Sequence, residues 1–335
     1  MTEETDTMQS VRCDLCDSDN HQTVLSGTDK LHRVSDERFD VVRCQKCGLM
    51  FTDPRPSENE IGRYYPSASY YAYQFDDFTH PPSGGLRKRA LESVLWREHG
   101  YPRANKGVFD ALLAMLSKGR YCGYPSYVEA TTILDVGCGS GEFLHLVSRF
   151  GLHGIGVERD SGAVAIAIQR GLDVREGTLE RVSFSPGSFD CVRASHVLEH
   201  LPSPKRALAL IKILLKNNGE LVILVPNAAG FLAKVFRENW FHLDLPRHFY
   251  HFTPSTIRTL LERSGFSDIR MRKYTAEQDF LGSMDYAMRS SEKGTRSSKS
   301  LFWHPMVRYP LIPIVQCMNQ LGIGDLMEVR ARKAG

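Results

Sequence analysis

The segment that most constrains the fold is ILDVGCGSGEFL, residues 133–144. An apolar run passes directly into three glycines spaced G-x-G-x-G (Gly137, Gly139 and Gly141) and then into an amphipathic stretch. This order predicts a buried strand, a tight glycine turn and the start of a helix. Because glycine tolerates a positive φ and lets the backbone approach a ligand closely, the segment predicts a ligand-binding turn.

The region around this turn alternates short apolar runs with helical patterns from residue 126 to residue 275. Such alternation is typical of an α/β fold with a doubly wound, mostly parallel sheet. We expect the strands at 132–137, 154–159, 189–195 and 219–226. We expect the helices at 140–151, 161–171 and 202–219, each ended by a glycine, and a further helix that Thr253 caps and Pro254 opens.

Two acidic residues narrow the choice of ligand. Asp135 stands two residues before the first glycine. A pyrophosphate bound there would not need a carboxylate, whereas an ammonium group would need one as its partner. Glu158 ends the next strand, where a carboxylate can accept both hydroxyls of a ribose. The ligand implied has a ribose, an amino group and no phosphate, and S-adenosylmethionine fits. A nicotinamide site and a turn that serves only chain reversal remain as alternatives.

With FDCVRASHVLEHLPSP and GELVILVPN added, these stretches resemble the class I S-adenosylmethionine-dependent methyltransferases over residues 128–275. The resemblance implies a seven-stranded Rossmann-like sheet and methyl transfer from S-adenosylmethionine. It implies that Asp135 and the backbone of Gly137 and Gly139 hold the methionine end of the cofactor. It also implies that Gly141 completes the turn and that Glu158 binds the ribose.

The resemblance extends to the adenine and the sulfonium. Thr178 stands where many relatives carry an acidic residue, so the adenine contact falls to Thr178 and to the backbone of Leu179. His196 is expected beneath the sulfonium and the acceptor. For Glu199 and His200, a catalytic role and a simple role at the start of a helix are both open.

Four cysteines form two C-x-x-C pairs, Cys13 with Cys16 and Cys44 with Cys47. Each pair places two thiolates on a tight knuckle, and two knuckles complete a tetrahedron around Zn²⁺. A glycine follows Cys47, where a knuckle requires a positive φ. Four thiolates leave no open position, so the sequence predicts a structural zinc ion. An iron or redox dithiol site is the alternative.

The segment NWFHLDLPRHFYHFTPSTI, residues 239–257, is rich in imidazole and aromatic groups. It resembles the P-R-H-x-x-H-F segment of one methyltransferase branch that is associated with sugar, polysaccharide and natural-product biosynthesis. Several relatives in that branch also begin with a two-knuckle cysteine module.

A hydroxyl acceptor must lose a proton, and a histidine suits that at neutral pH. We rank His248 first as general base, followed by His251 and His196. The expected acceptor contacts are Arg247, Trp240 and Tyr71, while a purely structural role stays open for each histidine and for the tyrosines.

Charge and composition limit the partners. The formal net charge is only +3, and the first 52 residues hold 10 acidic and 6 basic residues, which disfavours RNA binding by the cysteine module. With no signal peptide and no apolar stretch of about 18 residues, we expect a cytoplasmic protein without a transmembrane segment.

The leading prediction is O-methylation of a sugar or secondary metabolite. An RNA methyltransferase and a non-catalytic cofactor-binding module are the alternatives, and a homodimer is left open.

The chain divides into four expected regions. They are a zinc-ribbon module (1–55), a Tyr/Pro-rich linker with helices (56–125), the cofactor-binding methyltransferase domain (126–275) and a C-terminal extension (276–335).

Overall fold

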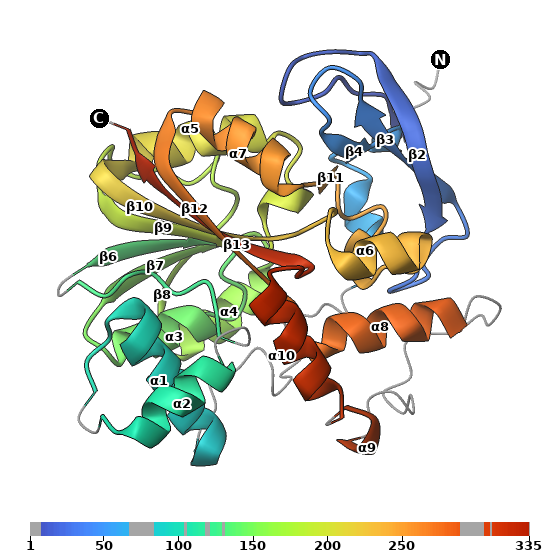
Figure 1. The fold of residues 1–335 in the computed structure, drawn as a ribbon. Coiled ribbons are helices and arrows are strands. Elements are labelled where there is room, and N and C mark those ends of the chain that lie inside the picture. Colours follow the sequence, from blue (N-terminus) through green and yellow to red (C-terminus); the bar gives the residue numbers. More distant parts are fainter. Residues whose placement is uncertain are drawn as a thin grey trace.

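The structure, a computed structural model, describes residues 8–66, 84–103, 106–117, 121–128, 131–288, 305–308 and 310–334. At its centre is a seven-stranded sheet in the order β12-β13-β10-β9-β6-β7-β8 (Figure 1). Its strands are β6 (Thr132–Val136), β7 (His153–Glu158), β8 (Asp173–Glu176), β9 (Phe189–Ser195), β10 (Leu215–Pro226), β12 (Phe266–Tyr274) and β13 (Leu326–Lys333). The five strands from β8 to β10 run parallel, and β13 runs antiparallel to both of its neighbours. The predicted doubly wound, mostly parallel sheet is confirmed.

Helices cover both faces of this sheet (Figure 1). On one side lie α5 (Pro204–Leu214) and α7 (Pro254–Arg263), and on the other lie α1 (Gly85–His99), α3 (Glu142–Ser148) and α4 (Ser161–Gln169). Neighbouring strand residues point into different cores, since Ile133 packs in one cluster and Leu134 in the other. Because side chains alternate along a strand, two helical layers require strands that are apolar on both faces, as these are.

The helix starts follow the expected capping chemistry. Asp160 caps α4 by accepting a hydrogen bond from Ala163 N at 2.8 Å. Thr253 and Thr256 form a reciprocal capping box at the start of α7, with Pro254 in the first turn. These caps satisfy amide groups that a helix leaves without an internal partner, and the predicted start of α7 is confirmed.

One predicted boundary is wrong. The helix expected to run to Gly219 ends at Leu214, and β10 begins at once with Leu215. Leu215 already pairs with Phe189, and the register then shifts before Glu220. Gly219 therefore lies at a strand irregularity, where a side chain would approach Lys216 O to 3.0 Å, and does not end a helix.

A second, four-stranded sheet lies beside the first, in the order β11-β4-β3-β2 (Figure 1). Three of its strands come from the N-terminal module, namely β2 (His21–Thr28), β3 (Arg38–Cys44) and β4 (Met50–Thr52). The fourth, β11 (Tyr250–His251), comes from the imidazole-rich segment. A two-stranded pair, β1 (Met8–Gln9) with β5 (Arg55–Pro56), completes the module. The cysteine module and the methyltransferase region thus share backbone hydrogen bonds.

The C-terminal segment also joins the main body. After α8 (Glu277–Met288), the described residues form α9 (Pro305–Arg308) and α10 (Leu311–Leu321), which are separate helices as the prolines predict. Then β13 inserts between β10 and β12, so a division at residue 275 cuts through the sheet. None of the described helices has the length and apolar character needed to cross a membrane.

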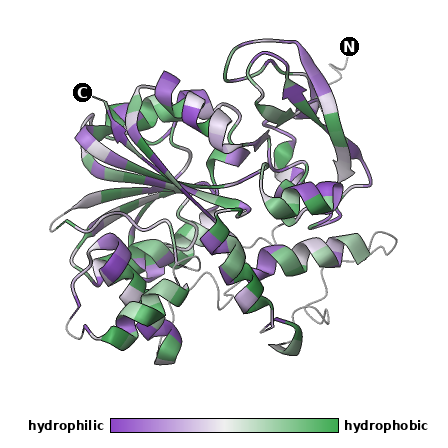
Figure 2. Ribbon diagram, in the orientation of Figure 1, coloured by the Kyte–Doolittle hydropathy of each residue, from purple (hydrophilic) through white to green (hydrophobic). Residues whose placement is uncertain are grey.

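The helix α2 (Val108–Ser117) packs on α1 and carries hydrophobic residues along most of its length (Figure 2). Several of these residues remain exposed, among them Val108, Phe109 and Leu112. Between β10 and α7 the chain forms α6 (Phe231–Phe236) and the short 3₁₀ helices η5 (Arg237–Asn239) and η6 (Phe241–Leu243), and another 3₁₀ helix, η1 (Ile61–Tyr64), follows β5.

Candidate functional site

The glycine turn lies between β6 and α3, at the carboxyl end of β6. Gly137, Gly139 and Gly141 all have positive φ, at 67°, 54° and 83°. A side chain on Gly137 would lie 2.6 Å from Val197 Cγ2, and one on Gly141 would clash with Leu172. Glycine is therefore required at this turn by the backbone conformation and, at two of the positions, by close packing.

Asp135 is fully buried on β6 behind the turn. Its Oδ1 accepts a hydrogen bond from Arg193 Nη1 at 2.8 Å, whereas Oδ2 is buried with no partner among the described residues. Burial raises the pKa of this carboxyl group, although Arg193 opposes that rise. A buried carboxylate oxygen without a donor is costly, so Asp135 has the capacity to accept one more hydrogen bond from a ligand.

Glu158 ends β7 and holds the turn in place. Its Oε2 accepts from Gly139 N and its Oε1 accepts from Asp160 N, both at 3.0 Å. Each carboxylate oxygen has a further lone pair for a ligand hydroxyl. Beyond β8, Thr178 is exposed and Leu179 is buried, and the Thr178 carbonyl accepts two backbone hydrogen bonds. These residues all lie at the carboxyl ends of parallel strands, which is where open α/β sheets bind ligands.

His196 follows β9 directly, with an unusual positive φ of 54°. Its side chain is 38% exposed, and its Nδ1 lies 3.3 Å from Oε1 of the fully buried Glu199. Glu199 belongs to the short 3₁₀ helix η4 (Leu198–His200). Burial alone would raise the pKa of Glu199, but the hydrogen bond from His196 and the surrounding imidazoles lower it to about 2. Glu199 is therefore an anion whose carboxylate faces Nδ1 of His196 and orients the imidazole ring.

The imidazole-rich segment surrounds this pair with further histidines. The His242 ring stacks on that of His196, with centroids 6.4 Å apart, and its Nε2 lies 2.9 Å from Asp279 Oδ1. Burial lowers the pKa of His242, but Asp279 outweighs burial and the net shift is upward. Asp279 reaches this place from α8, more than thirty residues along the chain.

His248 and His251 are more deeply buried than His196. His248 Nδ1 lies 2.9 Å from the His242 carbonyl oxygen, and His251 Nε2 lies 3.5 Å from Thr52 Oγ1. Burial lowers the pKa of His248 well below its usual value and that of His251 to about 4. Both imidazoles are thus neutral at neutral pH.

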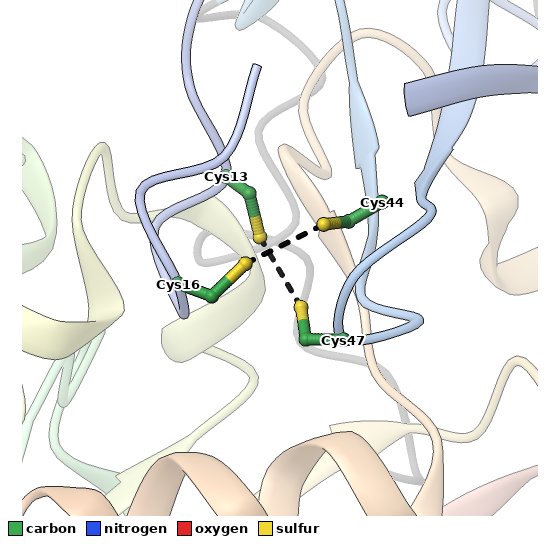
Figure 3. A group of neighbouring side chains, drawn as sticks. All are labelled: Cys13, Cys16, Cys44 and Cys47. Atoms are coloured by element: carbon green, nitrogen blue, oxygen red, sulfur yellow. Dashed lines mark hydrogen bonds between the residues drawn. The ribbon is translucent and has the colours of Figure 1, made fainter. Parts of the chain in front are cut away.

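The four cysteines converge on one point (Figure 3). Cys13 Sγ lies 3.4 Å from Cys47 Sγ, and Cys16 Sγ lies 3.5 Å from Cys44 Sγ. The four Sγ atoms all lie within 4.8 Å of one another. The glycine after Cys47, Gly48, has a φ of 77° as the knuckle geometry predicts.

The model of a family described as "Methyltransferase domain" matches residues 96–270, which hold the glycine turn and the imidazole-rich segment. The chain belongs to this family. Its parallel sheet, glycine turn and acidic residues are those of a class I S-adenosylmethionine-dependent methyltransferase domain.

Curated relatives are similar to part of the chain. A ubiquinone biosynthesis O-methyltransferase of Maricaulis maris is 30% identical over 152 residues, which is 42% of this chain and 60% of the relative. One of Cereibacter sphaeroides is 27% identical over 209 residues, which is 57% of this chain and 85% of the relative. The chain thus spans only about three fifths of the length of the first of these relatives.

Some solved structures are similar to this chain at low sequence identity. A methyltransferase from Archaeoglobus fulgidus has 23% identity and a TM-score of 0.43, covering 61% of this chain and 86% of that chain. A Haemonchus contortus phosphoethanolamine N-methyltransferase in complex with S-adenosylmethionine has 20% identity and a TM-score of 0.45, covering 78% of this chain and 60% of that one.

Of the three residues predicted to contact the acceptor, the structure describes Arg247 and Trp240, and both are buried. The Arg247 side chain is 1% exposed and pairs with Asp29 at 2.7 Å and Asp244 at 2.6 Å, so its donors bind protein groups. Trp240 is buried, and its Nε1 has no hydrogen-bond partner among the described residues. Tyr71 lies outside the residues that the structure describes.

Sequence reasoning missed the partners of the predicted residues. Arg193, which pairs with Asp135, stands two residues before the end of β9, between the buried residues Val192 and Ala194. An arginine within such a strand is itself a signal, because a buried cation needs a carboxylate partner. Asp279 gives no such local signal, since it lies in an ordinary amphipathic helix.

Proposed function

We propose that this methyltransferase domain transfers the methyl group of S-adenosylmethionine to a hydroxyl group of a small molecule, with a sugar or secondary metabolite as the leading acceptor class. The observation that carries the proposal is the position of the His196–Glu199 pair beside the glycine turn. Val197, the residue after His196, packs so closely on Gly137 that no side chain fits between them. A partly exposed base therefore stands next to the turn that would hold the cofactor. The O-methyltransferase names of the curated relatives support the same chemistry.

The residues present fit the cofactor. Asp135 Oδ2 is a buried acceptor that lacks a donor within the described part of the chain, and the ammonium group of the methionine end would supply one. Glu158 would bind the ribose hydroxyls through its remaining lone pairs, while Thr178 and the Leu179 backbone would border the adenine. The positive-φ glycines allow the backbone to come close to the ligand.

The chain's own contribution to the reaction is positioning and proton transfer. When bound, S-adenosylmethionine supplies a methyl group that is already activated by a sulfonium. His196 accepts the proton of the acceptor hydroxyl at Nε2, because its Nδ1 faces Glu199. The Glu199 carboxylate stabilises the imidazolium that forms, as in other imidazole–carboxylate pairs. We favour His196 over His248 and His251 because it is the most exposed of the three.

The four cysteines are proposed to hold a structural Zn²⁺. Zn–S bonds of about 2.3 Å in a tetrahedron place sulfurs about 3.8 Å apart, close to the 3.4 and 3.5 Å seen here. Burial raises the pKa of the Cys13 thiol, and a bound cation would offset that cost by stabilising the thiolate. The ion would join the knuckle that precedes β2 to the knuckle between β3 and β4.

The test uses methyl-deuterated S-adenosylmethionine with fractionated small-molecule extracts. Mass spectrometry should detect an acceptor heavier by the labelled methyl, bonded to oxygen, together with S-adenosylhomocysteine. His196→Ala should lower turnover by about 10²–10⁴-fold, the usual contribution of a general base. Cofactor affinity, measured by calorimetry, should change little. A labelled RNA or protein product, or a His196→Ala variant with unchanged turnover, would refute the proposal.

A further inference from the structure

A second group of potential metal ligands lies beside His196, apart from the four cysteines. Glu199 and His200 come from η4, and His248 comes from the imidazole-rich segment. One donor atom from each of these three residues lies within 4.8 Å of the other two. The rings of His200 and His248 meet edge to face, with centroids 4.6 Å apart.

The hydrogen bonds of the two imidazoles determine which nitrogen is available. His200 Nδ1 lies 3.0 Å from the Arg247 carbonyl oxygen, and His248 Nδ1 lies 2.9 Å from the His242 carbonyl oxygen. A carbonyl oxygen can only accept, so each Nδ1 carries the proton and donates it. The Tyr65 hydroxyl oxygen lies 3.0 Å from His200 Nδ1 and is a second acceptor for that proton. In a neutral ring the lone pair is then on Nε2. This is the arrangement found behind metal-binding histidines, where a backbone carbonyl fixes the tautomer and the ring orientation.

Glu199 provides an independent observation. The residue is completely buried, and Oε1 bonds to His196. Its other oxygen, Oε2, is buried with no hydrogen-bond partner among the described residues. A carboxylate oxygen in this state loses its water without a hydrogen bond that replaces it. A cation next to Oε2 would remove that cost.

From these contacts we propose that Glu199, His200 and His248 bind a divalent transition-metal ion. Two imidazole nitrogens and one carboxylate oxygen suit zinc, manganese or iron, and three protein ligands leave at least one position open for water or a substrate oxygen. Asp244 Oδ2 lies 3.8 Å from His248 Nε2, and both oxygens of Asp244 accept hydrogen bonds from Arg247. Asp244 therefore adds negative charge near the ion, and Arg247 holds this carboxylate in place.

The site would select the acceptor. An open coordination position beside His196 fits a substrate with two neighbouring oxygens, one bound to the metal and one delivered to the base. A bound divalent ion lowers the pKa of a coordinated hydroxyl group and orients it. This role in acceptor binding rests on the proposed function, whereas metal binding itself does not.

Metal binding can be measured without turnover. Full-length protein with its cysteine module loaded with zinc is titrated with Mn²⁺ and, separately, with Zn²⁺, by calorimetry and by electron paramagnetic resonance of free Mn²⁺. We expect one additional ion per chain. Glu199→Gln and His248→Ala should each lower the affinity at least tenfold, and His145→Ala, which removes an exposed histidine on α3, should leave it unchanged. Thermal melting and calorimetry with S-adenosylmethionine show that each variant is folded.

The proposal is overturned if neither ion binds at one additional equivalent, or if folded Glu199→Gln binds as tightly as the parent protein. Failure of the proposed function gives a different result. Metal binding that depends on Glu199 and His248, without any labelled small-molecule product, would leave the metal site in place and refute O-methylation.

Discussion

Arg247 offers a sharp test of how the two halves of the molecule are held together. Its guanidinium is 1% exposed and pairs with Asp29 of the N-terminal module and with Asp244 of the imidazole-rich segment. It also donates to the Tyr64 carbonyl at 3.0 Å. Arg247→Met keeps the apolar stem but leaves two carboxylates in the interior without their cation. Removal of one partner from a buried ion pair costs about 3–5 kcal/mol.

The chain provides a matched control in Arg270, which also pairs with an aspartate. Arg270 and Asp268 are 75% and 47% exposed, and pairs of that kind contribute about 0–1 kcal/mol. Urea unfolding with linear extrapolation measures both variants against the parent protein. Asp29→Asn in the Arg247→Met background should restore part of the loss, because one uncompensated charge is removed. A loss below about 1 kcal/mol for Arg247→Met, equal to that of Arg270→Met, would show that the buried network does not hold the module.

Three further predictions concern other parts of the molecule. Cys47→Ser should release the proposed zinc ion, detected by a colorimetric chelator, and lower the melting temperature, while Cys317→Ser at an exposed position should do neither. Gly137→Ala should reduce S-adenosylmethionine affinity and stability by about 1–3 kcal/mol, whereas Gly171→Ala, at a positive φ but in open space, should affect stability alone. For His99, burial and Arg330 lower the pKa from 6.5 to about 4, so the unfolded state binds the proton first. The stability from this residue is complete above pH 6.5 and is lost as pH falls towards 4; His99→Gln should flatten that part of the stability–pH curve by about 3 kcal/mol.

The parts of the fold that local patterns specify could be predicted. β6, the glycine turn and α3 follow from ILDVGCGSGEFL alone, because strand, turn and helix signals stand in direct succession. The positive φ of Gly48 follows from knuckle chemistry in the same way. The capping box at Thr253 is likewise a feature of adjacent residues.

Contacts between distant segments could not be read in this way. β13 lies between β10 and β12, although its sequence, LMEVRARK, does not indicate with which strands it pairs. β11 has only two residues, too short for a periodic signal, and its partner β4 belongs to another region. Pairing of this kind is decided by the packing of whole elements. For the same reason, the sequence predicted that imidazoles lie near the site but did not predict which of them are buried.

The pairing of β11 with β4 also has a consequence in time. Thr52 and His251, which meet across this sheet, are 199 residues apart. At synthesis rates of about 5–20 residues per second, the edge of β4 stays unpaired for roughly 10–40 s until β11 has been synthesised. An unpaired strand edge is a template for association with other chains. The N-terminal module, although made first, is therefore among the last parts of the protein to be completed, and during that interval its open edge is where a nascent chain needs protection.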